Sequence, residues 1–367
     1  MPAETEPAPA VDAIAAPNSN PARIHLYRPQ NQLGDLLLTV PAIRSIRERF
    51  PRAHIVLVVG RQNADAVLGQ PWADEIRVVD TRNFLGVMRA GWRDLARAAA
   101  RRGGGPDLAV YFTTVSYSRS SALLVRWSGA RERIGFDPAR YGERDAAGLT
   151  RVAAPPGQGA RGGRVATPML GPNPGPEAAP IHQSEWSLLL ARAAGAGVRP
   201  EPPYYIPDRA LLARSPEGAV YLHPGAGKPH NRWPADRFAE VARELTERGR
   251  SVWWLEGPQD PGTVDQAARA LGFSLPVVRG ETIPMLAARF QRASLYVGND
   301  TGPLHLAGAV GCPAVGIYGW TDPAEWRPVG RCVRSVRAMD HKLESISSRD
   351  VLNVALPLLE EDRCAVV

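Results

Sequence analysis

The chain has 367 residues, 44% of them hydrophobic, and a formal net charge of +7 that comes mainly from arginine. This length favours two domains, and no stretch approaches the roughly 20 consecutive apolar residues that a membrane helix needs. No dense Lys/Arg run with interleaved aromatic residues occurs, so nucleic-acid binding is not expected. Residues 1–22 are acidic and rich in Pro and Ala, without the basic start and apolar run of a signal peptide, which predicts a disordered tail on a cytoplasmic protein.

The first half of the chain alternates short β-branched runs with longer amphipathic stretches. Apolar runs predict buried strands at residues 24–27, 55–59, 76–79 and 108–112. The stretch after the first strand places five apolar residues on one helical face, namely Leu36, Val40, Ile43, Ile46 and Phe50. Buried strands separated by helices indicate a parallel sheet with both faces covered.

A change in composition then separates the two halves. From about 142 to 180 the chain is rich in Gly, Pro and Ala with little periodicity, which predicts a long loop or flexible insertion. A helix is predicted from about 182 to 194. The Pro-rich connector at 199–207 follows it, and we expect the domain boundary there.

The alternation restarts in the second half. Strands are predicted at 220–223, 252–255, 277–278, 295–298 and 314–318. Helices are predicted at 235–248, 264–271, 283–292, 304–310 and 348–359. We expect two doubly wound halves, with the binding site between them at the carboxyl ends of the strands.

Three strand-to-helix turns carry residues suited to chemistry. In the first, Gly34 permits a tight turn and Asp35 opens a helix. A carboxylate at this place either caps free backbone amides or accepts a proton from a hydroxyl group, and the segment alone does not decide between these roles.

The second turn, at residues 223–234, follows the first strand of the second half. A turn containing Gly225 exposes backbone amides, which suits a phosphate, and Lys228 and Arg232 supply positive charge. The spacing is neither a Walker A nor a GxGxxG motif. The alternative is a solvated basic loop whose tryptophan packs on the domain.

The third turn, at residues 298–309, is rich in small residues. Asp300 and Thr301 are good helix caps, and Gly302 lets the backbone approach a ligand closely. Free amides at a helix start suit a diphosphate. His305 would project from the first helical turn, or would be a partly buried, hydrogen-bonded histidine.

Two smaller features lie at the same predicted edge. Asp260 follows a strand at a place suited to a ribose-binding carboxylate, although an ordinary turn would look the same. Trp320 would either stack on a base or sugar or pack on the protein. The three cysteines lack the paired spacing of a zinc site, and no suitably placed DxD pair occurs, so neither a metal nor a cofactor is expected.

Taken in order, these turns resemble the motifs of the heptosyltransferases of glycosyltransferase family nine, which act in lipopolysaccharide core synthesis. The matching segments are Gly-Asp with its apolar helix at 34–42, Pro-Gly to Arg-Trp-Pro at 224–234, Asp-Thr-Gly-x-x-His-Leu-Ala at 300–307, Gly-x-Pro at 311–313 and Tyr-Gly-x-Thr-Asp-Pro at 318–323. The resemblance covers about residues 23 to 355.

The resemblance implies a GT-B fold, with two Rossmann-like domains facing each other across a cleft. The expected parts are a tail at 1–22, an acceptor domain at 23–199 with a Gly/Pro-rich loop at 150–180, a nucleotide-sugar domain at 200–345, and a C-terminal helix and tail at 346–367. It also implies inverting, metal-independent transfer of a heptosyl group from ADP-heptose to a glycan or glycolipid acceptor. The basic charge suits such anionic ligands and peripheral contact with the inner membrane surface.

By the same resemblance, Asp35 corresponds to the catalytic base, residues 300–305 to the diphosphate site and Asp260 to the ribose-binding acid. Family members usually carry Lys two residues before the Trp, but this chain has Asn231 there, so Lys228 or Arg232 would have to replace that charge. Two alternatives stay open. One is a transferase of the same fold with another nucleotide sugar or acceptor, and the other is a non-catalytic nucleotide-sugar-binding protein.

Overall fold

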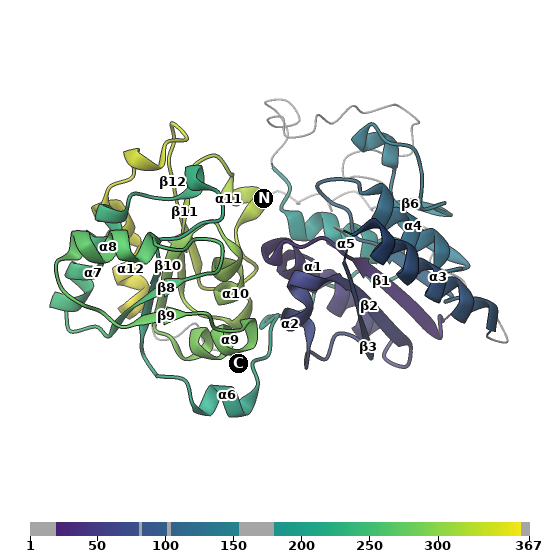
Figure 1. The fold of residues 1–367 in the computed structure, drawn as a ribbon, viewed down its shortest axis with the longest axis horizontal. Coiled ribbons are helices and arrows are strands. Elements are labelled where there is room, and N and C mark those ends of the chain that lie inside the picture. The colour runs from purple at the N-terminus through teal and green to yellow at the C-terminus, as the bar shows by residue number, and fades with distance from the viewer. Residues whose placement is uncertain (1–19, 81–82, 101–103, 154–179, 361–367) are drawn as a thin grey trace, which may run out of the picture.

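Two parallel six-stranded sheets, each covered by helices, form the computed structural model (Figure 1). The structure describes residues 20–80, 83–100, 104–153 and 180–360. Most of the predicted tail at 1–22, most of the predicted loop at 150–180 and the last residues of the chain therefore lie outside the described residues. The predicted α/β fold with two Rossmann-like halves is confirmed. None of the helices in the described ranges is both long and apolar enough to cross a bilayer.

The front half contains the sheet with strand order β3-β2-β1-β4-β5-β6. Its strands are β1 (Arg23–Arg28), β2 (His54–Gly60), β3 (Glu75–Val79), β4 (Leu108–Tyr111), β5 (Glu132–Phe136) and β6 (Arg151–Ala153). One face packs against α1 (Leu33–Arg49) and α5 (Gln183–Ala193), and the other packs against α3 (Phe84–Ala100) and α4 (Arg119–Trp127). Because helices cover both faces, almost every residue of the central strands β1, β2 and β4 is buried.

The rear half contains the sheet with strand order β12-β11-β10-β7-β8-β9. Its strands are β7 (Val220–His223), β8 (Val252–Glu256), β9 (Val277–Arg279), β10 (Leu295–Asn299), β11 (Ala314–Tyr318) and β12 (Val333–Arg337). One face packs against α7 (Ala235–Glu247), α8 (Thr263–Leu271) and α12 (Ser348–Glu360). The other face packs against α9 (Ile283–Arg292) and α10 (Gly302–Val310).

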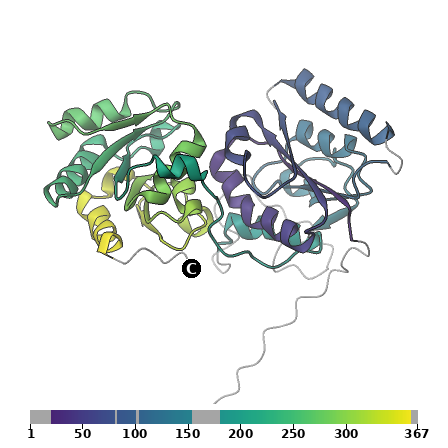
Figure 2. The ribbon, with the colours of Figure 1, turned by 90° about the horizontal axis from the view of Figure 1, so that it is seen from below.

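A single core cluster runs through both halves. It joins apolar residues of α1 and α5 to those of α9 and α10. The connector contributes Tyr204 and Tyr205, whose amides both donate to the carbonyl of Ala309, at 2.8 and 3.0 Å. Figures 1 and 2 show the two halves side by side, and Figure 1 places α1 and α10 at their junction.

The strands and helices that the apolar pattern predicts are present, with ends shifted by a few residues. Three strands were not predicted: β5, β6 and β12. The expected loop from about 142 was wrong at residues 151–153, which form β6. Both β6 and β12 lie at sheet edges, where arginines interrupt the apolar pattern.

Candidate active site

Asp35 lies in the first turn of α1, after the turn at residues 29–32 that leaves β1. Buried Asn63 holds this turn, because its side-chain amide donates to the carbonyl of Gln30 at 2.9 Å. The Asp35 carboxylate accepts a hydrogen bond from Nη2 of Arg28 at 2.9 Å, and it caps no backbone amide among the described residues. The helix-capping interpretation is therefore not supported. Arg28 instead orients a carboxylate that is 23% exposed.

The sequence analysis did not identify Arg28 as a site residue. It is the last residue of β1, its side chain is only 4% exposed, and it also donates to the side chain of Gln30. A buried guanidinium needs anionic or polar partners, so its position fixes both of these side chains. The available signal was an arginine directly after the predicted buried strand at residues 24–27.

The loop after β7 is held by Asn299, a second residue that sequence reasoning missed. Asn299 is fully buried at the end of β10, where its amide group donates to the carbonyls of Pro224 and Gly225 at 3.0 and 3.1 Å. Arg232 donates through Nε to the carbonyl of Ala226 at 2.8 Å, and Lys228 is exposed. Among the described residues, neither cation is paired with a carboxylate, so both charges are available to an anionic ligand.

Asp260 is placed differently from the ribose-binding acid that we expected. Its side chain is 4% exposed and its Oδ2 lies 2.8 Å from Nε2 of His223. The other ring nitrogen of His223 lies 3.0 Å from the hydroxyl of Tyr296, and burial raises the pKa of Tyr296 well above its usual value. A Cβ added at Gly225 would lie 1.2 Å from the Asp260 carboxylate, so this glycine is what lets the loop close over it. This burial disfavours a direct contact between Asp260 and a ribose.

The turn from β10 to α10 carries the remaining predicted residues. The Asp300 carboxylate accepts from the Thr321 hydroxyl at 2.7 Å, and the Thr301 hydroxyl donates to the carbonyl of Asn299 at 3.2 Å. The side chain of Thr301 caps no amide, and the amides of Thr301 and Gly302 have no hydrogen-bond partner among the described residues. Two free amides at a helix start therefore coincide with the predicted diphosphate site.

His305 is buried beside this turn. Its Nε2 lies 3.6 Å from Oδ1 of Asp300, while its Nδ1 has no hydrogen-bond partner among the described residues. The ring is buried as predicted, but the 3.6 Å separation is longer than a hydrogen bond, so neither ring nitrogen is hydrogen-bonded among the described residues. A buried polar atom without a partner is unusual and marks a place for a water molecule or a ligand group.

Two glycines bring the halves into contact at this point. A Cβ at Gly34 would lie 2.7 Å from the ring of His305, and a Cβ at Gly302 would lie 3.1 Å from Leu33. Residues on each side of the junction thus pack directly against the start of the opposite helix. The structure therefore brings the start of α1, which carries Asp35, next to the start of α10.

The exposed Trp320 follows β11 at the carboxyl edge of the rear sheet. Its side chain is 70% exposed and stacks on His341, with ring centroids 5.4 Å apart and an interplanar angle of 13°. The indole is thus held in one orientation with one face open. That geometry suits stacking on a base or sugar better than packing within the core.

The model of glycosyltransferase family 9 (heptosyltransferase) matches residues 114–354, which is well over half of the chain. The chain belongs to this family. The enzyme is 26% identical over 309 residues to lipopolysaccharide heptosyltransferase 3 of Escherichia coli, a match that covers 80% of this chain and 83% of that relative. It is therefore a glycosyltransferase, and the non-catalytic alternative is set aside.

Solved structures of the family share its fold. A family 9 glycosyltransferase from Veillonella parvula superposes with a TM-score of 0.76 at 20% identity, covering 94% of this enzyme and all of that chain. The E. coli heptosyltransferase WaaC with ADP-2-deoxy-2-fluoro heptose superposes with a TM-score of 0.66 at 20% identity, covering 90% of this enzyme and 98% of that chain.

Proposed function

We propose that the enzyme transfers a heptosyl group from ADP-heptose to a glycan or glycolipid acceptor such as the lipopolysaccharide core, with inversion and without a metal ion. The observation that supports the proposal is the contact of Gly34 with His305, which packs the first turn of α1, where Asp35 lies, against the first turn of α10. A base and a diphosphate site on opposite sides of one junction are what inverting transfer requires. The sugar nucleotide analogue bound to the similar WaaC structure supports the choice of donor.

On the donor side, the enzyme has to stabilise the leaving diphosphate. Breaking the glycosyl–phosphate bond leaves its electron pair on the diphosphate and builds positive charge on the sugar ring. We assign the amides of Thr301 and Gly302 to the diphosphate, with Lys228 and Arg232 supplying the charge that the family lysine gives elsewhere. Loss of one such donor typically slows catalysis about a hundredfold or more. We assign Asp260 to supporting the Gly225 loop.

On the acceptor side, we assign Asp35 as the general base. Its carboxylate takes the proton of the acceptor hydroxyl while the hydroxyl oxygen bonds to the anomeric carbon, and ADP departs from the opposite face. The ion pair with Arg28 leaves the second carboxylate oxygen without a hydrogen-bond partner among the described residues. A positioned base of this kind contributes roughly 10²–10⁴ in rate.

The first test compares Asp35→Asn with the unchanged enzyme. We expect the rate of heptosyl transfer to fall by about 10²–10⁴, because the amide accepts no proton at neutral pH. The dissociation constant for ADP should stay within about twofold, because the donor-binding residues lie in the rear half. Titration calorimetry measures binding, and chromatographic detection of the glycosylated acceptor measures transfer. Undiminished transfer by this variant would remove Asp35 from its assigned role.

The donor itself is tested by offering ADP-heptose, ADP-glucose, UDP-sugars and GDP-sugars in parallel and measuring nucleotide release. A preference for ADP-heptose supports the proposal. A preference for another sugar nucleotide would favour the alternative that the change at Asn231 kept open, a family member with a different donor. Lys228→Gln and Arg232→Gln, each measured with the preferred donor, identify which cation supplies the missing charge.

A further inference from the structure

A row of large apolar side chains lies exposed along α3, on the front half. Its members are Leu85, Met88, Trp92 and Leu95, which follow one another at intervals of three or four residues. Trp92 is 73% exposed and Leu85 is 65% exposed, and the other two are each 38% exposed. We call these four residues the α3 stripe. Single exposed apolar residues are ordinary, but a continuous row on one helix face marks an interaction surface.

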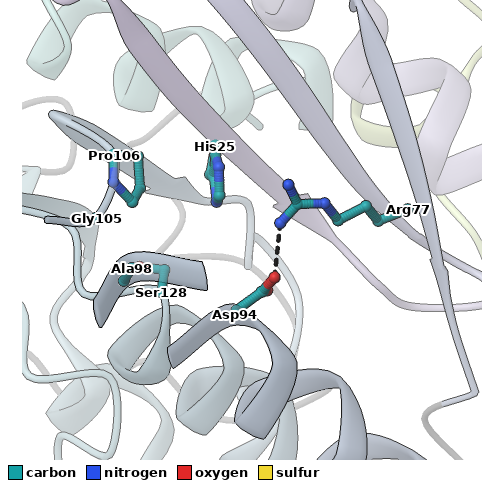
Figure 3. Close-up of a pocket in the computed structure, with 7 residues that line it drawn as sticks. All are labelled: His25, Arg77, Asp94, Ala98, Gly105, Pro106 and Ser128. Carbon is teal, nitrogen blue, oxygen red and sulfur yellow. Dashed lines mark hydrogen bonds and ion pairs between the residues drawn. The ribbon is translucent and has the colours of Figure 1, made fainter. Parts of the chain in front are cut away.

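The helix is anchored so that the α3 stripe cannot turn inward. Val87 is fully buried, and a Cβ at Gly91 would lie 1.9 Å from the ring of Trp127 on α4. Asp94 forms a buried ion pair with Arg77 of β3 at 2.6 Å, which Figure 3 shows. The cavity beside this pair measures about 10 Å³, enough for about one water molecule, and takes no part in docking. Burying the stripe by rotating α3 would break all of these contacts.

The exposed charges that α3 itself carries have one sign. Arg89 and Arg93 are exposed on the same helix, and neither forms an ion pair among the described residues. The only acidic residue of α3 is Asp94, which is buried. An apolar row flanked by arginines is the pattern of a helix that lies in the interface of an anionic bilayer. A second copy packed stripe to stripe would bring the arginines of both copies together, where they repel each other.

We propose that the α3 stripe, with Arg89 and Arg93, docks this enzyme on the surface of an anionic lipid bilayer. The inference extends the proposed function, since a glycolipid acceptor lies in such a surface. The position of α3 fits this role. Strands β1 and β3 both run parallel to β2, so their carboxyl ends lie at the same edge of the front sheet. Helix α3 follows β3 and helix α1, which carries Asp35, follows β1, so both helices start at this edge. Docking through α3 would therefore hold the acceptor side of the junction near the headgroups.

The test measures binding of the full-length enzyme to sedimented vesicles of phosphatidylcholine with phosphatidylglycerol, and to vesicles of phosphatidylcholine alone. We expect the double variant Leu85→Gln/Trp92→Gln to bind the anionic vesicles about tenfold more weakly or worse. Arg89→Gln/Arg93→Gln should weaken binding about fivefold for each arginine, because each contributes about 1 kcal/mol at an anionic surface. Its residual binding should no longer respond to added salt.

The matched control is Val198→Gln, which removes an apolar side chain that is 75% exposed but lies outside α3. It should bind vesicles like the unchanged enzyme. Equal binding by the stripe variant and the unchanged enzyme overturns the proposal. The proposal is also overturned if the enzyme binds no vesicles but forms a dimer in sedimentation velocity that the stripe variant does not form. That outcome would assign α3 to contact with a second copy. Asp35→Asn should still bind vesicles fully, so failure of docking and failure of the transferase proposal are read separately.

Discussion

Among single residues, the Arg28–Asp35 pair has the most direct bearing on the chemistry. The predicted base would be a flexible, partly exposed side chain without the guanidinium that holds it at 2.9 Å. Arg28 also reaches Gln30, so one buried cation fixes two side chains of the turn that precedes α1. We therefore treat Arg28 as a positioning residue that acts through Asp35.

Arg28→Lys tests this role. Lysine keeps the charge but cannot hold two side chains with one planar group, so Asp35 should lose its fixed orientation. We expect kcat to fall about tenfold to a hundredfold while KM for the donor changes little, because misplacing a catalytic group by about 1 Å costs on the order of a hundredfold. Steady-state kinetics with saturating acceptor separates the two constants.

The double variant Arg28→Lys/Asp35→Asn provides the control. If Arg28 acts only by orienting Asp35, the double variant should be no slower than Asp35→Asn alone. Additive losses would instead mean that Arg28 has a separate structural or substrate-binding role.

The sequence indicated some site residues and could not place others. Asp35, Gly302 and His305 were predicted as site residues because each stands in a turn with a recognisable pattern. For Asp260 nothing in the sequence indicated its partner His223, which is 37 residues away and reaches 2.8 Å only in the folded sheet. Asn299 gave no signal, since its three hydrogen bonds all go to the backbone of a loop more than 60 residues earlier.

Among the helices and strands, the contact between the starts of α1 and α10 sets the geometry of the candidate site. The two helix starts pack closely because Gly34 leaves room for the ring of His305 and Gly302 leaves room for the side chain of Leu33. Such close packing transmits a small change in one helix to the other.

Gly34→Ala should show this sensitivity. Its new Cβ would lie 2.7 Å from the ring of His305, so the ring or α1 has to move by a few tenths of an ångström. We expect kcat/KM for transfer to fall roughly tenfold or more, with ADP affinity nearly unchanged.

Gly86→Ala in α3 is the matched substitution, because its Cβ would approach nothing closer than 3.4 Å. Both changes raise helix propensity by up to about 1 kcal/mol, so a loss confined to Gly34→Ala isolates the contact. Equal kinetics for the two variants would show that the close approach has no catalytic consequence.

The sequence predicted the strands that are buried on both faces, and it missed strands at the sheet edges. Central strands such as β2 and β4 are nearly continuous apolar runs because helices cover both faces. The edge strands β6 and β12 have no such run, because arginines occupy some of their positions. The α3 stripe shows the opposite effect, since an apolar pattern there leads to an exposed face that sequence alone would assign to the core.

In the molecule as a whole, the contacts that join the halves include the shared core, the connector amides on Ala309, and His182. His182 caps α5 in the front half, and its Nε2–H donates to the carbonyl of Arg327 in the rear half at 2.8 Å. Its Nδ1 accepts from the amide of Ser184 at 3.2 Å. Both ring nitrogens are therefore satisfied only when the imidazole is neutral.

This arrangement predicts a pH dependence of stability. The pKa of His182 is lowered from its usual 6.5 to about 4, mainly by burial and also by the positive charges of Arg327 and Arg199, while the hydrogen bond to the carbonyl of Arg327 partly offsets these effects. The folded state resists protonation, so the contribution of His182 to stability is fully present above about pH 6.5 and is lost as pH falls toward 4. A shift of this size corresponds to about 3 kcal/mol of unfolding free energy.

Other groups titrate over the same range, so the measurement has to isolate His182. His182→Asn keeps a side chain that accepts from a helix amide but does not titrate. We expect the difference in unfolding free energy between the unchanged enzyme and this variant to shrink by about 3 kcal/mol between neutral pH and about pH 4, as measured by denaturant titration. Carboxylates and the other histidines contribute equally to both proteins and cancel. A difference that stays constant with pH would contradict this prediction. It would mean that protonation of His182 does not destabilise the contact between the halves.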